Sequence, residues 1–236
     1  MNLLKVILYF YARKISPGFV PSEKALVIDI GSGDKPFWRA DVFVDDLTLG
    51  NVQRASESKT IHNIGKFVSG NVNKLPFTDN AFDFSFCCHL LEHVDDPAIA
   101  IREITRVSKA GYVEIPNGII EAVQPFVSHI WFVYLNKKKL IFVRKSERMH
   151  EVLSLNENKF FPIIKNAGDP FIRFYWKGNI EFEIIDGLST KEKYRSPKKL
   201  KRQKKSYNYY LIFVRIMRVF FYKKKNIPAN LEKTRK

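Results

Sequence analysis

ALVIDIGSG, residues 25–33, joins an almost unbroken apolar run to a glycine-rich turn. A continuous apolar run of this length is typical of a parallel strand that is buried on both faces. Glycine lacks a Cβ and tolerates positive φ, so the turn at Gly31–Gly33 lets the backbone come close to a ligand. Ligands of open α/β sheets bind outside the carboxyl ends of the strands. The stretch therefore predicts a buried strand that ends at a binding site.

Strands and helices alternate along the rest of the first 190 residues. We predict strands at 41–46, 66–69, 82–87, 112–116, 131–134, 140–143, 171–176 and 179–185. We predict helices at 97–109, with Asp96 as the N-cap and Pro97 as the first helical residue, and at 119–127. About ten residues separate the first two strands, too few for a full crossover helix. This order favours an open, mostly parallel α/β sheet, with the later strands forming hairpins or closing the sheet.

The charge of the chain is concentrated at its C-terminus. The chain has 236 residues, of which 45% are hydrophobic, and a formal net charge of +16. Residues 191–236 hold 17 Lys and Arg but 2 Asp and Glu, so +15 lies in this tail and +1 in everything before it. We predict an N-terminal amphipathic helix at 1–22, one domain at 23–190 and a basic, amphipathic tail at 191–236.

Cysteine usage and the N-terminal residues favour a cytoplasmic location. The two cysteines, Cys87 and Cys88, are adjacent, which excludes a disulfide framework and fits a reducing compartment. The apolar run at 3–12 lacks a cleavage pattern and is too short to span a bilayer.

An acidic residue, Asp45, lies at the end of the next predicted strand. Asp45 is placed to accept hydrogen bonds from the two hydroxyls of a ribose. A dinucleotide site would have a third glycine where this chain has Pro36, and a phosphate-binding P-loop sequence is absent. The pattern favours a nucleoside without a pyrophosphate, although a glycine pair alone can also be a plain tight turn.

Several ordered motifs between residues 23 and 117 resemble the class I S-adenosylmethionine-dependent methyltransferases, in particular a small-molecule branch. These motifs are the strand and turn at 27–33, Gly70-Asn71, Leu75-Pro76-Phe77, Phe82-Asp83, HLLEHV at 89–94, Glu103, Arg106-Val107 and 111–116. The resemblance implies a Rossmann-like, seven-stranded, mostly parallel sheet with one antiparallel strand and flanking helices. It also implies S-adenosylmethionine as the cofactor.

The resemblance assigns cofactor-binding roles to individual residues. Asp29, Gly31 and Gly33, with Ser32 between the glycines, would flank the methionine part, and Asp45 would hold the ribose. His89 would lie on the methionine side, near the sulfonium.

The adenine ring would lie against Asn71 and Val72. Asn71 stands where the family usually has an aspartate, and its amide oxygen would accept a hydrogen bond from the adenine amino group. Val72 would offer a backbone amide and an apolar contact. Asn71 and the short first connection are the departures from the family pattern.

Histidines are the candidate general bases for methyl transfer to a hydroxyl. We name His129 and His93 as candidate catalytic residues, with His150 as a further candidate and Trp131 as a ring that could stack on the acceptor. A structural role for each histidine remains an alternative. His89 to His93 also matches H-x-x-E-H, a zinc pattern, but a third ligand is not evident, so we assign no metal site.

The tail has the composition of an interfacial helix. Residues 207–222 are apolar except for Asn208, Arg215 and Arg218, and lysines lie on both sides. A polar stripe that includes Arg218 and Tyr222 would lie beside anionic headgroups, so we predict that residues 195–225 bind the inner face of a membrane. Packing of this helix on the body and binding of nucleic acid are the alternatives.

These observations predict S-adenosylmethionine-dependent methyl transfer to a small molecule or to a saccharide or lipid-linked precursor, as in surface-glycan synthesis. The alternatives are a non-catalytic binding or scaffold protein on the same fold, and an RNA methyltransferase that uses the basic tail. The nearly neutral body argues against RNA.

Overall fold

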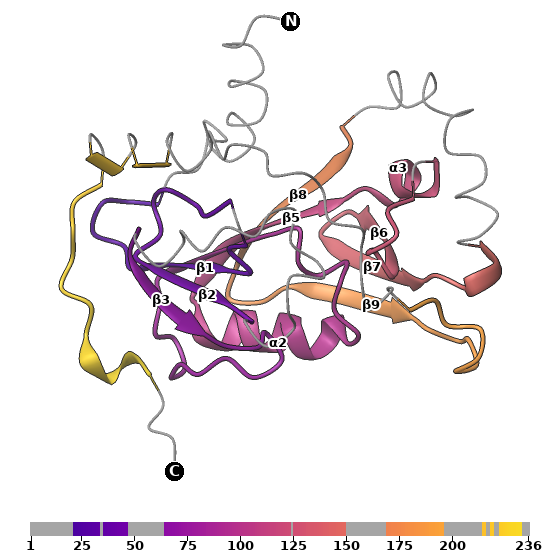
Figure 1. Ribbon diagram of the computed structural model, residues 1–236, viewed down its shortest axis with the longest axis horizontal. Coiled ribbons are helices and arrows are strands. Elements are labelled where there is room, and N and C mark those ends of the chain that lie inside the picture. The colour runs from indigo at the N-terminus through magenta and orange to yellow at the C-terminus, as the bar shows by residue number, and fades with distance from the viewer. Residues whose placement is uncertain are drawn as a thin grey trace, which may run out of the picture.

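Two β-sheets lie side by side along the long axis of the molecule, as the computed structural model shows (Figure 1). The structure describes residues 21–33, 35–46, 64–123, 125–149, 169–195, 214–215, 218–219 and 222–232. The predicted N-terminal helix lies outside the described residues except for its last two positions, and His150 lies outside them entirely.

The larger sheet has six strands in the order β3-β2-β1-β4-β5-β8. Its strands are β1 (Val27–Ile30), β2 (Val42–Asp45), β3 (Lys66–Ser69), β4 (Phe84–Cys88), β5 (Ala110–Pro116) and β8 (Phe171–Lys177). The first five are parallel, and β8 is antiparallel to β5, as predicted. Ile30 pairs with Val44 on one side and with Cys87 on the other. The carboxyl ends of β1, β2 and β4 therefore meet at one edge.

The prediction of a seven-stranded sheet is wrong for the described residues. β6 (Trp131–Asn136), β7 (Lys139–Arg144) and β9 (Glu181–Ile185) form a separate three-stranded sheet. A two-residue turn joins β6 to β7, and Lys137 in this turn has a φ of 54°. Such a turn requires antiparallel pairing of the two strands it joins. β9 then pairs with β7, so β8 remains the edge of the larger sheet.

Two helices of the described chain begin where the sequence predicts. α2 (Pro97–Val107) starts at the N-cap Asp96, whose side chain accepts a hydrogen bond from the backbone N–H of Ile99 at 3.1 Å. α3 (Gly118–Val123) is shorter than the predicted helix at 119–127. Pro125 explains the difference, since proline disfavours a helical conformation in the residue before it.

A continuous core joins the two sheets. The buried cluster includes Ile30 and Leu91 near the edge described above, Ile104 of α2, and Trp131 and Phe142 of the smaller sheet. The same apolar core therefore packs against both sheets.

The opposite face of the larger sheet is covered by aromatic side chains. Between β1 and β2 the described residues form no helix, which agrees with the short connection. Phe37 and Trp38 from this connection are buried instead, and the ring of Phe37 stacks on Phe86 of β4 at a centroid distance of 4.2 Å. Val214 from the C-terminal tail is fully buried in the same cluster.

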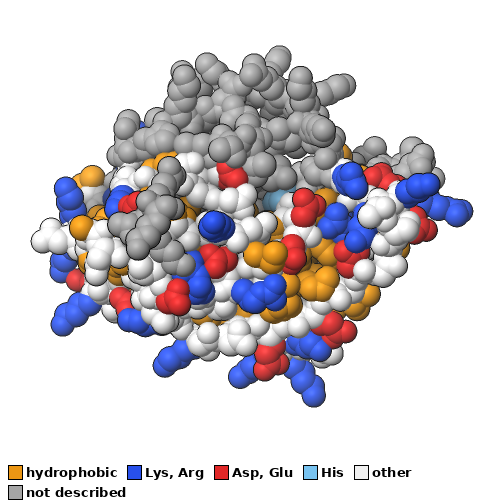
Figure 2. Space-filling model, turned by 90° about the horizontal axis from the view of Figure 1, so that it is seen from below, with side chains coloured by type: hydrophobic (Ala, Val, Ile, Leu, Met, Phe, Trp, Pro, Cys, Tyr) orange, Lys and Arg blue, Asp and Glu red, His pale blue; other side chains and the backbone are white. Residues whose placement is uncertain are grey.

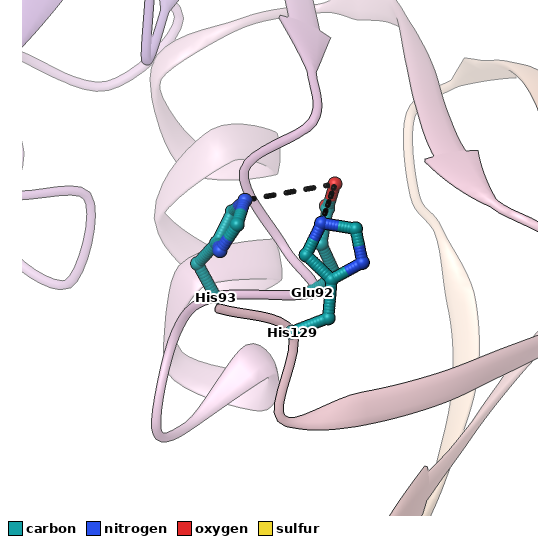
Figure 3. Close-up of side chains that lie close together, drawn as sticks. All are labelled: Glu92, His93 and His129. Carbon is teal, nitrogen blue, oxygen red and sulfur yellow. Dashed lines mark ion pairs between the residues drawn. The ribbon is translucent and has the colours of Figure 1, made fainter. Parts of the chain in front are cut away.

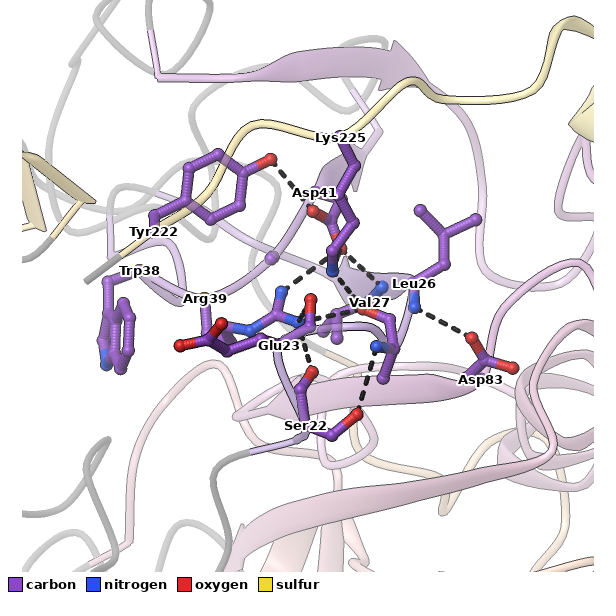
Figure 4. Close-up of polar contacts among 12 residues, drawn as sticks. Ser22, Glu23, Leu26, Val27, Trp38, Arg39, Asp41, Asp83, Tyr222 and Lys225 are labelled. Atoms are coloured by element: carbon purple, nitrogen blue, oxygen red, sulfur yellow. Dashed lines mark hydrogen bonds and ion pairs between the residues drawn. The ribbon is translucent and has the colours of Figure 1, made fainter.

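The described part of the tail binds the body at the amino ends of β1 and β2 (Figure 4). The guanidinium of Arg218 donates hydrogen bonds to the backbone oxygens of Trp38 and Ala40, at 2.9 and 2.6 Å. The Tyr222 hydroxyl donates to Asp41 Oδ1 at 2.9 Å, and Lys225 Nζ lies 3.3 Å from Asp41 Oδ2.

The tail then continues along the body as far as the turn at Phe77. Leu231 is buried, its backbone oxygen accepts a hydrogen bond from Thr78, and Glu232 forms a β-bridge with Phe77. The expectation that Arg218 and Tyr222 face lipid headgroups is wrong for these two residues, because their polar groups bind the body. Most of the predicted interfacial helix lies outside the described residues. Within the described part of the chain, no helix combines the length and apolarity needed to cross a bilayer.

Candidate active site

The two acids that the sequence singles out bind backbone N–H groups of the glycine turn after β1 and of the connection that follows it. Gly31 and Gly33 have φ values of +72° and +50°. Asp45 Oδ2 accepts a hydrogen bond from the Gly33 N–H at 2.8 Å. Asp29 is buried, and its Oδ2 accepts from the N–H of Phe37 at 2.6 Å. The predicted site residues of this region therefore lie together at the carboxyl edge of the sheet.

The turn has room for a ligand at one glycine and not at the other. A Cβ added at Gly31 would lie 3.0 Å from two side-chain carbons of Leu90, whereas at Gly33 the nearest atom would be 3.9 Å away. Ser32, between them, is buried, and its hydroxyl has no hydrogen-bond partner among the described residues. An open approach at Gly33 beside the Asp45 carboxylate fits the polar groups of a nucleoside.

Asn71 follows β3 but binds its own neighbours. Its Oδ1 accepts a hydrogen bond from the Asn73 N–H at 2.9 Å, and its Nδ2 donates to Asp46 Oδ2 at 2.8 Å. A carbonyl oxygen has a second lone pair, so the predicted contact with adenine requires Oδ1 to accept two hydrogen bonds. Val72 is 9% exposed, and its side chain packs in the core that joins the two sheets.

His89, just after β4, lies between two carboxylates. It has a φ of +54°, its Nε2 lies 3.2 Å from Glu114 Oε1, and its Nδ1 lies 3.4 Å from Glu92 Oε1. Burial alone would lower the pKa of His89, but the interactions with Glu114 and Glu92 outweigh burial and raise the pKa to about 9. Both ring nitrogens are thus directed at carboxylates, which makes His89 a protonated structural link at the edge of the site.

Glu114 of β5 was missed by the sequence analysis. It is 2% exposed and accepts hydrogen bonds from the Tyr112 hydroxyl at 2.7 Å and from Arg173 Nε at 3.2 Å. The available signal was a single glutamate inside the apolar strand YVEIP. A buried charge in such a position must be paired.

The structure brings together the two predicted catalytic histidines. The rings of His93 and His129 lie 4.7 Å apart between centroids, although 35 residues lie between them in the sequence. His93 Nδ1 is 2.9 Å from the backbone oxygen of Ser128, and His129 Nδ1 is 2.8 Å from Glu121 Oε2. Both Nε2 atoms lie 3.9 Å from Glu92 Oε1 (Figure 3). Burial lowers the pKa of His93, so its ring is neutral near pH 7.

His129 contacts Glu121, which also forms a buried ion pair with Lys145. Lys145 has a fully buried side chain and pairs with Glu121 Oε1, while Glu121 Oε2 contacts His129. Glu121 Oε1 also accepts a hydrogen bond from the N–H of Phe126, at 2.8 Å. Glu121 therefore fixes the loop between α3 and β6 that carries His129.

Trp131 does not stack on an acceptor. Its ring is 1% exposed, its Nε1 donates a hydrogen bond to the backbone oxygen of Val94 at 2.7 Å, and Arg144 lies over it at 4.8 Å. The prediction of a stacking role is wrong, because the first residues of β6 point into the core.

Comparison with known proteins agrees with this geometry. Residues 29–113 match the family model described as a methyltransferase domain. The chain carries a class I S-adenosylmethionine-dependent methyltransferase domain. The matched region begins at Asp29 and ends within β5, so it contains the glycine turn, Asp45, Asn71 and His89.

Individual relatives match about the same region. A demethylmenaquinone methyltransferase of Renibacterium salmoninarum is 32% identical over 98 residues, 40% of this chain and 40% of the relative. A ubiquinone/menaquinone biosynthesis C-methyltransferase of Hahella chejuensis is 32% identical over 122 residues, 47% of this chain and 49% of the relative. The chain thus spans less than half the length of these two relatives.

Solved structures show a lower similarity. A Thermotoga maritima protein described as a possible histamine N-methyltransferase has a TM-score of 0.37 and 20% identity, over 49% of this chain and 58% of the other. Residues beyond the methyltransferase domain, including His129, fall outside the family match.

Proposed function

We propose that this protein transfers a methyl group from S-adenosylmethionine to a small-molecule acceptor. The observation that carries the proposal is the glycine turn at the carboxyl edge of the sheet, where Asp45 accepts a hydrogen bond from the Gly33 N–H and Asp29 accepts one from the Phe37 N–H. The methyltransferase domain and the named activities of the curated relatives support the same reaction.

S-adenosylmethionine supplies an electrophilic methyl group on its sulfonium. The residues of this chain would position the two reactants, which is the main contribution that an in-line displacement needs from a protein. Gly33 would admit the cofactor close to the backbone, and Asp45 would accept hydrogen bonds from the ribose. His89 would border the methionine side as a fixed cation that is neutralised by Glu92 and Glu114.

The acceptor proposal stays at the level of a small molecule. The curated relatives are named for quinone substrates, which makes a demethylated quinone the first acceptor to test. A saccharide or lipid-linked precursor of a surface glycan, expected from the sequence, is the second. A panel with a radiolabelled methyl donor separates these two classes by which product carries the label.

RNA as the acceptor has no support from the described residues on the face drawn in Figure 2. Figure 2 shows basic and acidic side chains interspersed on one face of the molecule, where an RNA site would present a continuous basic patch.

Membrane attachment through the tail rests on its charge of +15. Flotation with anionic vesicles tests it, with substitutions in the lysine run at 198–205, because these leave Arg218, Tyr222 and Lys225 in place on the body.

Calorimetry with S-adenosylhomocysteine tests the proposed function. The native chain should bind, and Asp45→Ala should weaken binding by about 10- to 100-fold, as expected for lost hydrogen bonds to a charged group. Asp186→Asn, at the end of β9 in the other sheet, is the matched control and should bind like the native chain. Absence of binding by the native chain at millimolar ligand would overturn the proposal and favour a non-catalytic scaffold.

A further inference from the structure

Glu92, His93 and His129 converge on one point beside the proposed cofactor site (Figure 3). Each offers one ligand atom, and these atoms all lie within 4.8 Å of one another. His89, the other histidine of the H-x-x-E-H pattern, does not belong to this group. His129 takes its place from the loop before β6, so the three-ligand set could not be identified from spacing along the chain.

The hydrogen bonds of the two histidines fix which nitrogen carries a proton. The Ser128 carbonyl and the Glu121 carboxylate can only accept hydrogen bonds, so Nδ1 of His93 and Nδ1 of His129 are the donors. Each Nε2 of a ring with this tautomer carries a lone pair and no proton, and both Nε2 atoms face Glu92 Oε1 at 3.9 Å. Metal-binding histidines usually donate a hydrogen bond in this way, from the ring nitrogen that does not bind the metal to a carbonyl or carboxylate oxygen.

Glu92 gives a second observation that points to a cation between these three side chains. Its side chain is 1% exposed, and neither carboxylate oxygen accepts a hydrogen bond within the described part of the chain. Its contact with His89 is an ion pair at 3.4 Å. Protonated His89 offsets the Glu92 charge from one side only. On the other side the two Nε2 lone pairs and Glu92 Oε1 face one another without a donor between them, and a cation at their centre would remove this repulsion.

We propose that Glu92, His93 and His129 bind a divalent transition metal ion of the Zn²⁺ type. Two imidazoles and one carboxylate are a ligand set found at catalytic zinc sites, where a fourth position stays open for water or substrate. Metal–ligand bonds of about 2.0–2.1 Å in a tetrahedron separate neighbouring ligand atoms by roughly 3.4 Å. The two 3.9 Å distances to Glu92 Oε1 therefore need to contract by about half an ångström, and the distances within the set, which reach up to 4.8 Å, by up to about 1.4 Å.

The proposed metal lies next to the edge where the cofactor would bind. Glu92 contacts His89, and His89 contacts Glu114 at the end of β5. The ring of Phe126, which is 52% exposed, lies 5.0 Å from that of His129 and marks the solvent side. This site goes beyond the proposed methyl transfer and replaces the expectation that the chain has no metal site.

Metal titration of the untagged, chelator-treated full chain tests the proposal. Zn²⁺ and Co²⁺ should each bind at about one ion per chain, and Co²⁺ should give the strong visible absorption of tetrahedral coordination. Glu92→Gln, His93→Ala and His129→Ala should each weaken binding on the order of 100-fold or more. Asp45→Asn is the control, since it alters the cofactor site and should keep the metal affinity.

Two results would overturn the proposal. One is the absence of stoichiometric metal binding by the native chain. The other is metal affinity that the three ligand substitutions leave unchanged. Where a substituted chain fails to fold, X-ray absorption of the native zinc-loaded protein decides, because two imidazole ligands are expected and a spectrum without imidazole scattering contradicts the assignment.

Discussion

Asp45 Oδ2 accepts a hydrogen bond from the backbone N–H of Gly33 at 2.8 Å, which ties the acidic end of β2 to the turn after β1. The register of the sheet makes this contact possible, because Ile30 and Val44 are paired one residue before the turn and the acid. Asp45 thus shapes the cradle in addition to its proposed contact with a ribose.

Alanine at Gly31 should impair the fold and cofactor binding together. Its φ of +72° costs an L-residue about 1–2 kcal/mol, and the added Cβ would meet Leu90 at 3.0 Å. We expect a loss of about 2 kcal/mol in the free energy of unfolding and much weaker binding of S-adenosylhomocysteine. Gly178→Ala is the matched control, with a φ of +78° and no atom within 4 Å of the added Cβ. It should show the backbone cost alone, and equal cofactor binding by both variants would contradict the role of the turn.

The strand, turn and Asp45 could be predicted from the sequence because local patterns determine them. Apolar continuity identifies β1, glycine identifies the turn, and parallel pairing places the acid of the next strand beside it. The approach of His93 to His129 could not be predicted, since it depends on the hairpin of the second sheet.

The contacts between the tail and the body could not be predicted from the sequence either. Tyr222 and Asp41 are 181 residues apart, and no periodicity distinguishes a polar stripe that binds a buried carboxylate from one that faces water. Composition predicts an amphipathic tail, but it does not identify the buried acid to which Tyr222 donates its hydrogen bond.

Tyr222→Phe should destabilise the body although Tyr222 lies in the tail. The substitution removes the hydrogen bond to Asp41 Oδ1, whose side chain is fully buried, and should lower the free energy of unfolding by about 1–3 kcal/mol. Lys223→Ala, one residue on, breaks an exposed pair with Glu23 and should leave the urea midpoint unchanged. Identical midpoints for Tyr222→Phe and the native chain would show that the tail does not stabilise the body.

The Lys145–Glu121 pair should show strong energetic coupling. Lys145→Met leaves a buried carboxylate without its cation, and Glu121→Gln leaves a buried ammonium, so each change should cost about 3–5 kcal/mol. The double variant should cost clearly less than the two single changes together, as measured by urea unfolding. In the exposed Lys139–Glu183 pair the same cycle should give a coupling below about 1 kcal/mol. Additive effects at Lys145 and Glu121 would contradict a buried, mutually dependent pair.

Tyr194 should make the stability of the protein sensitive to alkaline pH. Its hydroxyl donates a hydrogen bond to the backbone oxygen of Val127 at 2.7 Å, and burial raises its pKa to about 12. Since the pKa of an unfolded tyrosine is about 10, the contribution of Tyr194 is complete below pH 10 and is lost as the pH rises through about 12. Tyr194→Phe should cost about 1 kcal/mol at pH 7 through the lost hydrogen bond, but should lack this alkaline loss.

The difference in unfolding free energy between the native chain and Tyr194→Phe should therefore shrink between pH 10 and pH 12. Tyr134 and Tyr222, whose pKa values burial also raises, titrate in both proteins and cancel in this difference. Urea unfolding at a series of pH values measures the difference, and a tyrosinate absorbance titration of both proteins assigns the late component to residue 194. A difference that stays constant across this range would mean that Tyr194 ionises equally easily in the folded and unfolded chains. The segment after β9 would then leave the hydroxyl accessible to water, and the Val127 contact that holds the loop carrying His129 would be absent in solution.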